Sequence, residues 1–135
     1  MNRVLFVCVH NAGRSVMAEA FFNRRAGGRG EAVSAGTVPQ EKPHPEVVET
    51  MGEVGIDVSG HAGRLLTDEM VKSADRVITM GCAVDEQACP AILYANVEDW
   101  GLPDPKGQSP ERVREIRDEV ARRVALLVKS LAASA

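Results

Sequence analysis

The loop from Cys8 to Ser15 is the sequence feature that most restricts the folds open to this chain. It follows the apolar run Val4–Val7, which reads as a buried strand, and it leads into a segment with apolar residues at helical spacing. Within it, five residues separate a cysteine from an arginine and a serine. A buried cysteine near a surface arginine is the simpler interpretation. The succession of strand, loop and helix instead favours a thiol placed at the carboxyl end of a strand.

The composition of this loop is typical of an anion site built around a reactive cysteine. Backbone N–H groups of the loop and of the helix N-terminus point toward a bound oxyanion, and the Arg14 guanidinium suits a tetrahedral anion. The same positive field favours the thiolate form of Cys8. Asn11 suits a left-handed backbone position, and Ser15 is a candidate to donate a hydrogen bond to Cys8, to cap the helix, or both. We expect phosphate or arsenate to bind to Val9, His10, Asn11, Ala12, Gly13, Arg14 and Ser15.

Length and charge point to one small domain without a nucleic-acid or membrane role. The chain has 135 residues, which we assign to a single domain over residues 1–135, and its net charge of −3 gives no basic field for nucleic acid. No apolar run approaches the roughly 20 residues of a membrane span, and the start of the chain lacks a signal-peptide pattern. We expect a cytoplasmic monomer whose three cysteines are reactive thiols rather than structural disulfides.

Strand-like and helix-like segments alternate along the chain. This alternation predicts an α/β fold, a four-stranded parallel sheet with helices on both faces. The predicted strands are Arg3–Val9, Ala32–Ser34, Asp75–Met80 and Ile92–Asn96. The predicted helices are Ser15–Arg25, Pro43–Val54, a short one capped by Thr67, and a last one opened by Ser109 and Pro110 with the apolar stripe Val113, Ile116, Val120, Val124 and Leu127. Ligands bind at the carboxyl ends of parallel strands, and Cys8, Cys82 and Asp104 each follow a predicted strand.

Cys82 and Cys89 lie in a polar and acidic stretch, separated by six residues. Two small buried residues are one interpretation, and a zinc site is disfavoured because the spacing is wide and no paired histidines follow. The third interpretation is a thiol pair that serves Cys8. Reducing a pentavalent oxyanion takes two electrons, so one thiol forms an adduct and a second releases the product as a disulfide forms. A third thiol then moves the disulfide to a surface segment, where an external dithiol reduces it.

Asp104 lies between two prolines, which stiffen the backbone and fix the direction of the carboxyl group. It is a candidate general acid for the leaving oxygen, although an aspartate beside proline is more commonly a turn residue. The histidines His10, His44 and His61 are interpreted as loop residues without a catalytic role. No metal site is predicted.

Together these motifs resemble the arsenate reductases built on the low-molecular-weight protein tyrosine phosphatase fold. The resemblance extends over essentially the whole chain and rests on Val7–Ser15, Ser34–Gly36, Cys82 with Cys89-Pro90, and Glu98–Gly101 with Asp104-Pro105. The anion loop is shared with the phosphatases. The cysteine pair and the Glu98–Pro105 segment indicate the reductase branch.

The resemblance implies a mechanism for arsenic detoxification. Its catalytic residues are Cys8, Arg14, Ser15, Cys82, Cys89 and Asp104. Cys8 attacks arsenate held by the loop, with Asp104 as the acid. Cys82 then attacks the adduct, so that arsenite leaves and a Cys8–Cys82 disulfide forms. Cys89 converts it to a Cys82–Cys89 disulfide, which thioredoxin reduces. No metal or organic cofactor is implied.

Two departures from the family pattern bear on this mechanism. Some members bind potassium near the anion loop, and Asn11, Glu19 and Ser34 match their ligands, but the remaining positions hold Ala62 and Arg64. An arginine there replaces the charge of the cation, so we predict no dependence on potassium. The loop interior also resembles members that use mycothiol, which leaves a mycothiol-dependent reductase open beside the thioredoxin-coupled one.

Two other functions remain as alternatives. A low-molecular-weight protein tyrosine phosphatase would use Cys8 and Asp104 without Cys82 or Cys89, but Pro103 and Lys106 offer no aromatic ring to stack on a substrate. A non-catalytic oxyanion or redox sensor would act through a partner, and no partner-binding segment is visible. The substitution Cys82→Ser separates the three: a reductase loses turnover, a phosphatase is indifferent, and a sensor shows no turnover even as wild type.

Overall fold

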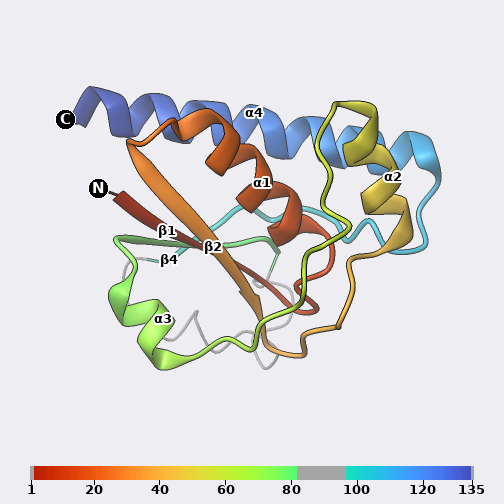
Figure 1. The fold of residues 1–135 in the computed structure, drawn as a ribbon, viewed down its shortest axis with the longest axis horizontal. Helices are drawn as coiled ribbons and strands as arrows, with labels where there is room; N and C mark the ends of the chain where they lie inside the picture. Colours follow the sequence, from red (N-terminus) through yellow and green to blue (C-terminus); the bar gives the residue numbers. More distant parts are fainter. Residues whose placement is uncertain (1, 82–96, 135) are drawn as a thin grey trace.

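A computed structural model describes residues 2–81 and 97–134, and its parallel strands follow the order β2-β1-β3-β4 (Figure 1). The strands are β1 (Asn2–Cys8), β2 (Gly30–Gly36), β3 (Arg76–Thr79) and β4 (Val97–Asp99). The helices are α1 (Arg14–Ala26), α2 (Pro45–Glu53), α3 (Asp68–Ser73) and α4 (Pro110–Ser134). β1 pairs with β2 on one side and with β3 on the other, so Cys8 ends an interior strand. This is the four-stranded parallel sheet that the sequence predicts.

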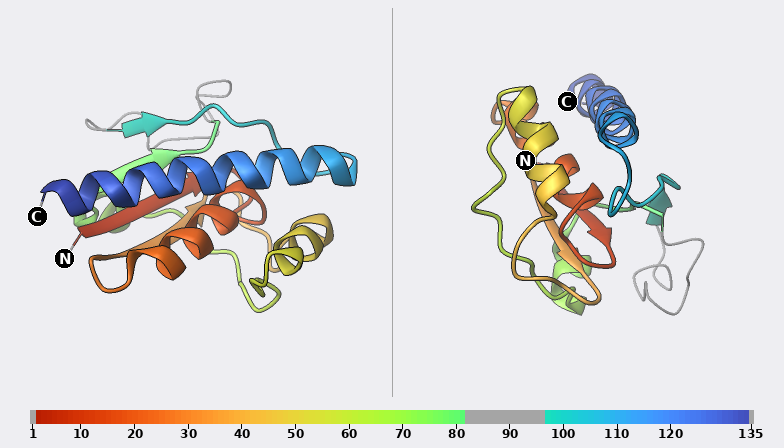
Figure 2. Two further views of the ribbon diagram at one scale, coloured as in Figure 1. Left: turned by 90° about the horizontal axis from the view of Figure 1, so that it is seen from above. Right: turned by 90° about the vertical axis from the view of Figure 1, so that its right-hand side faces the viewer.

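The side chains of β1 alternate between two apolar cores, as expected for a buried strand. Phe6 and Cys8 face the core that α1, α2 and α4 cover, where the Phe6 and Trp100 ring centroids are 5.6 Å apart. Leu5 and Val7 face a second core, to which α3 contributes. Helices therefore cover both faces, as predicted, and α1 and α4 lie side by side on the first of them (Figure 2).

The helix ends follow local sequence signals. α1 stops before Gly27, whose φ of 55° is left-handed and costs glycine little. Thr67 accepts a hydrogen bond from the Met70 amide at the start of α3, and Ser109 accepts one from the Arg112 amide at the start of α4. The predicted apolar stripe of α4 is buried in full: Val113, Ile116, Val120, Val124 and Leu127. In the part of the chain that the structure describes, no helix is long and apolar enough to span a membrane.

Two further differences from the predicted elements concern the start of α2 and the fourth strand. α2 begins at Pro45 rather than at Pro43, because the residue before a proline avoids helical dihedrals and His44 is extended. The predicted strand Ile92–Asn96 lies outside the described residues. β4 is not predicted by the sequence, since its two acidic residues interrupt the apolar pattern that marks a strand.

Candidate active site

The backbone of the loop after β1 is turned so that amide groups face its interior. The carbonyl oxygens of residues 9, 10 and 12 accept hydrogen bonds from amides of the 38–44 segment at 2.8–2.9 Å. Because the C=O and N–H of a trans peptide point in opposite directions, the amides that follow these carbonyls face away from that segment. Asn11 has a left-handed φ of 49°, as predicted. Amides of successive residues that face the same way are an arrangement that binds anions.

Cys8 is a buried free thiol, 4% exposed, and its Sγ lies 2.9 Å from Oγ of Ser15. Nδ2 of Asn11 donates a hydrogen bond to the same Oγ at 2.9 Å. The Ser15 hydroxyl therefore accepts from Asn11 and has its own hydrogen to donate to the sulfur. This is one of the two roles expected for Ser15. The other, helix capping, is wrong, because Gly13 is the residue that precedes the helix and Ser15 lies inside α1.

Two backbone carbonyl groups, one after β3 and one after β4, hold the Arg14 side chain in place. Its Nη1 donates to the carbonyl oxygen of Met80 at 3.0 Å, after β3, and to that of Leu102 at 2.7 Å, after β4. Gly81 adjoins the same atom, because a Cβ at this position would lie 2.5 Å from Arg14 Nη1. The guanidinium is thus fixed at the first turn of α1, beside the loop that carries Cys8.

Asp104 has the turn role weighed from the sequence, and its role as a general acid stays a prediction. Its Oδ1 accepts a hydrogen bond from the Lys106 amide at 2.9 Å, which makes it a turn aspartate, and the residue is exposed. Its loop nevertheless packs on the anion loop, since Pro105 Cγ lies 3.1 Å from the place of a Cβ on Gly13. Burial lowers the pKa of His44, and the Asp104 carboxylate opposes that shift, so the two side chains are within electrostatic range. A proton donor near the loop is therefore compatible with the geometry.

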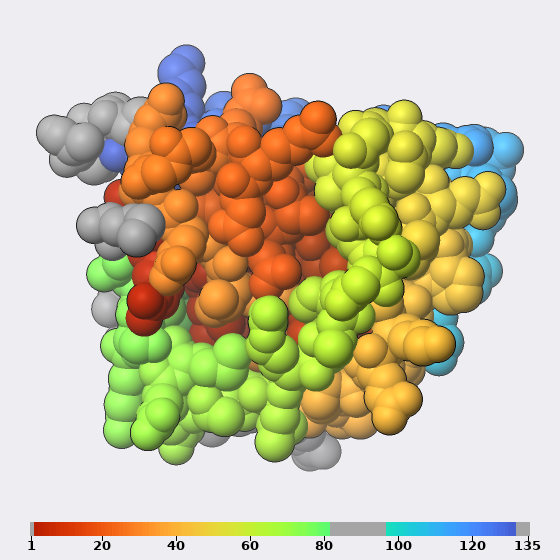
Figure 3. Space-filling model, viewed as in Figure 1, coloured from red at the N-terminus to blue at the C-terminus, as the bar shows by residue number. Residues whose placement is uncertain are grey.

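A cluster of polar side chains contacts Asn11 and supports the loop. The sequence does not predict that His61 belongs to this cluster. His61 Nε2 lies 3.1 Å from Asn11 Oδ1, and its Nδ1 lies 3.6 Å from Glu19 Oε2. The backbone N–H of Arg64 also donates to Asn11 Oδ1, at 3.0 Å. Both residues belong to the segment between α2 and α3, which crosses the face shown in Figure 3 beside α1. No local pattern links His61 to a loop 50 positions earlier, so the sequence offers no signal for this contact.

Arg64 contacts oxygen atoms of residues that the family resemblance assigns to potassium. Its Nη1 lies 3.1 Å from Glu19 Oε1 and 3.4 Å from the carbonyl oxygen of Ser34. Burial raises the pKa of Glu19, but hydrogen bonds and charge from His61, Arg64 and Ser34 outweigh it and lower the pKa overall. An ionised carboxylate thus faces a guanidinium where a potassium ion is expected in some relatives. Independence of potassium remains a prediction.

Cys82 and Cys89 lie outside the described residues. The chain enters that segment from Gly81, beside Arg14. Within residues 2–81 and 97–134, no three His, Cys, Asp or Glu side chains lie close enough to hold a metal ion.

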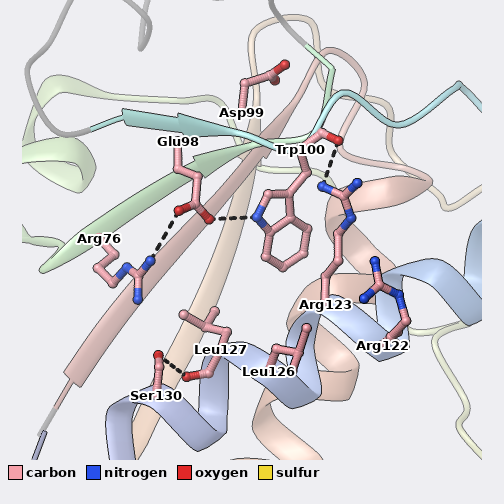
Figure 4. A pocket seen from close by; sticks show the side chains of 9 residues that line it. All are labelled: Arg76, Glu98, Asp99, Trp100, Arg122, Arg123, Leu126, Leu127 and Ser130. Atoms are coloured by element: carbon pink, nitrogen blue, oxygen red, sulfur yellow. Dashed lines mark hydrogen bonds and ion pairs between the residues drawn. The ribbon is translucent and has the colours of Figure 1, made fainter.

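A surface cavity of about 450 Å³ lies between β4 and α4 (Figure 4). None of its described lining residues belongs to the loop from Cys8 to Ser15. Its arginines are already paired, Arg76 with Glu98 at 3.3 Å and Arg123 with Glu119 at 2.7 Å. We therefore do not assign the oxyanion to this cavity.

Comparison with known proteins agrees with the fold and with the resemblance drawn from the motifs. A putative arsenate reductase of Halobacterium salinarum is 44% identical over 124 residues, covering 88% of this chain and 85% of that protein. A solved arsenate reductase in the phosphate binding state is 36% identical with a TM-score of 0.84, over 97% of this chain and 99% of that one. A thioredoxin-dependent arsenate reductase of Corynebacterium glutamicum is 37% identical with a TM-score of 0.80 over 100% of this chain, which spans 64% of that protein's chain.

The family described as low molecular weight phosphotyrosine protein phosphatase matches residues 3–135. The match includes the anion loop, the strands and the helices described above. This chain therefore belongs to the low molecular weight phosphotyrosine protein phosphatase family.

Proposed function

We propose that this chain is an arsenate reductase, which converts arsenate to arsenite in arsenic detoxification with electrons from thioredoxin. The observation that carries the proposal is the buried Cys8 thiol at the amide-lined loop, hydrogen-bonded to Ser15 and next to Arg14. The reductases of Halobacterium salinarum and Corynebacterium glutamicum support the substrate and the reductant. One domain of residues 1–135 carries the activity.

The first step joins arsenic to sulfur. The Cys8 thiolate attacks arsenic, so that an S–As bond forms and an As–O bond breaks, while arsenic stays pentavalent. The loop amides and Arg14 balance the negative charge of the oxyanion. Asp104 supplies a proton to the leaving oxygen, which departs as water. The Ser15 hydroxyl stabilises the thiolate before the attack.

The second step carries the redox change. Cys82 attacks the Cys8 sulfur, so that an S–S bond forms and the S–As bond breaks, with its electron pair staying on arsenic. Arsenic gains two electrons and leaves as arsenite, while two thiols become one disulfide. Cys89 then attacks Cys82 and frees Cys8, and thioredoxin reduces the Cys82–Cys89 disulfide by exchange.

Arsenate-dependent NADPH oxidation, with thioredoxin and thioredoxin reductase supplied, tests the proposal. The wild type turns over steadily. Cys89→Ser releases about one arsenite per enzyme and stops, because the first disulfide has no route to thioredoxin. Cys82→Ser releases none. Hydrolysis of p-nitrophenyl phosphate is the control, since it needs Cys8 but neither of the other cysteines and persists in both variants. Steady arsenite release by Cys82→Ser would contradict the cascade.

A phosphatase is the second candidate, and the description of the matching family favours it. It needs only the groups at the described site: Cys8, Arg14 and Asp104. It predicts no arsenite and no effect of Cys82→Ser. If arsenate is reduced only with a mycothiol or glutaredoxin system, the reaction stands and thioredoxin is replaced as the reductant. If no reductant and no phosphate ester support turnover, the chain is a sensor.

We also propose that the protein works in the cytoplasm as a monomer. A mechanism that oxidises two of its three thiols to a disulfide in each turnover needs a reducing compartment to regenerate them. Every catalytic group named above comes from a single chain. Light scattering of the purified protein and fractionation of the producing cells test the two statements separately.

A further inference from the structure

We propose that Asp99 is a positioning residue for Arg14 and acts through the peptide group between Met80 and Gly81. The inference deepens the proposed function and rests on its anion site, but it does not depend on the cysteine cascade. Asp99 is the last residue of β4, and no step described above uses it.

The two ends of this peptide group are hydrogen-bonded to the two residues. The Gly81 N–H donates to Asp99 Oδ1 at 2.9 Å, and the Met80 carbonyl oxygen accepts from Arg14 Nη1 at 3.0 Å. The N–H and C=O of a trans peptide point in opposite directions, so a carboxylate that holds the N–H also aims the C=O at the guanidinium. The peptide dipole has its positive end at the carboxylate and its negative end at the guanidinium. Each hydrogen bond therefore strengthens the other.

Asp99 is itself held in position by the sheet. Thr79 is its partner in the pairing of β3 with β4, and Thr79 Oγ1 donates to the same Oδ1 at 2.7 Å. Figure 4 shows the Asp99 side chain on the opposite side of β4 from Glu98 and Trp100. The Asp99 carboxylate thus lies at the end of β3, next to the Met80–Gly81 peptide group that contacts Arg14.

The backbone at Gly81 comes close to Arg14. Gly81 has a φ of 141°, and a Cβ there would lie 2.5 Å from Arg14 Nη1 and 2.8 Å from the Leu102 carbonyl oxygen. Only glycine leaves room for this approach. The Leu102 oxygen is the second anchor of Nη1, at 2.7 Å. Loss of Asp99 therefore loosens one of two carbonyl anchors and leaves the other, which predicts weaker anion binding rather than its abolition.

Phosphate protection of Cys8 against iodoacetamide measures anion binding without turnover, with alkylation of the Cys8 peptide followed by mass spectrometry. Asp99→Ala should need about tenfold more phosphate for half-protection, the effect of losing one charge-assisted hydrogen bond. The alkylation rate without phosphate is measured for each variant as its own baseline, because a shift of Arg14 also changes the positive field at the Cys8 thiolate. Asp99→Asn should restore part of the protection, since the amide oxygen accepts the same two hydrogen bonds but without the negative charge.

Glu98→Ala is the matched control, because Glu98 is the neighbouring acidic residue and bonds to Trp100 and Arg76 on the other side of β4. It should leave protection unchanged. If Asp99→Ala does not fold, Thr79→Val should weaken phosphate binding in the same direction. Wild-type protection in Asp99→Ala, or no rescue by Asp99→Asn, would overturn the proposal. No protection of the wild type would instead overturn the anion site on which it rests, whether or not the protein reduces arsenate.

Discussion

Cys8 lies at the end of a directed series of hydrogen bonds. Oδ1 of Asn11 accepts from the backbone N–H of Arg64 and lies 3.1 Å from His61 Nε2, while Nδ2 donates to Ser15 Oγ. The orientation of the Asn11 amide therefore fixes the direction of the Ser15 hydroxyl hydrogen toward the sulfur. Ser15→Ala should slow the alkylation of Cys8 by iodoacetamide by about tenfold near neutral pH, since a thiolate loses its neutral donor.

Ser109→Ala is the matched control for this prediction, because Ser109 accepts a hydrogen bond at the start of α4, far along the chain from Cys8. It should leave the alkylation rate unchanged. An unchanged rate in Ser15→Ala would mean that the 2.9 Å contact contributes nothing to the reactivity of the thiol.

At the scale of single residues, the sequence predicts conformations and contacts that lie within one loop. The left-handed Asn11 and the contact of Ser15 with Cys8 follow from the spacing within one loop, and both are confirmed. His61 and Arg64 contact Asn11 although they lie 50 and 53 positions away from it in the sequence. Composition and periodicity carry no information about such pairs. The sequence alone therefore indicates an ordinary loop residue at His61, and only the family resemblance gives Arg64 a role.

Among the elements, the segment between α2 and α3 places a cationic side chain where the family resemblance expects a potassium ion. Arg64 places its guanidinium against Glu19 and the Ser34 carbonyl oxygen. We predict equal rates of arsenate reduction in sodium and potassium salts at equal ionic strength, because the positive charge is already present. Arg64→Ala should be slower in sodium and partly restored by potassium, since its removal leaves oxygen atoms that suit a monovalent cation.

Arg76→Ala is the control for the ion experiment, because Arg76 pairs with Glu98 in an exposed ion pair of β3 and β4. It should respond equally to the two salts. Clear activation of the wild type by potassium would show that Arg64 does not take over the role of the cation.

Element boundaries show the same division between local and distant causes. α4 is predictable because its apolar stripe and its Ser109 cap are both local. β4 is not, because Glu98 and Asp99 join the sheet through pairing with Ile78 and Thr79 rather than through an apolar pattern of their own. The residue that we propose as the support of Arg14 therefore lies in the strand that the sequence does not predict.

For the whole molecule, Glu19 joins three parts of the fold and couples stability to pH. It extends from α1 to Ser34 of β2 and to His61 and Arg64 of the connecting segment. Because its pKa is lowered from the ordinary value of 4.5 in the folded state, the ionised carboxylate stabilises the fold above that value. This contribution is lost as pH falls through the folded pKa, where both states bind the proton.

Glu19→Gln, which keeps the shape of the side chain, should lower the free energy of unfolding by about 1–3 kcal/mol near pH 7. The difference from the wild type should shrink below the ordinary pKa of 4.5, and urea unfolding at a series of pH values measures it. Glu31→Gln is the control, because its ion pair with Arg3 is about half exposed and should contribute little at any pH. If Glu19→Gln were as stable as the wild type near pH 7, the shape of the side chain rather than its charge would hold the three parts together.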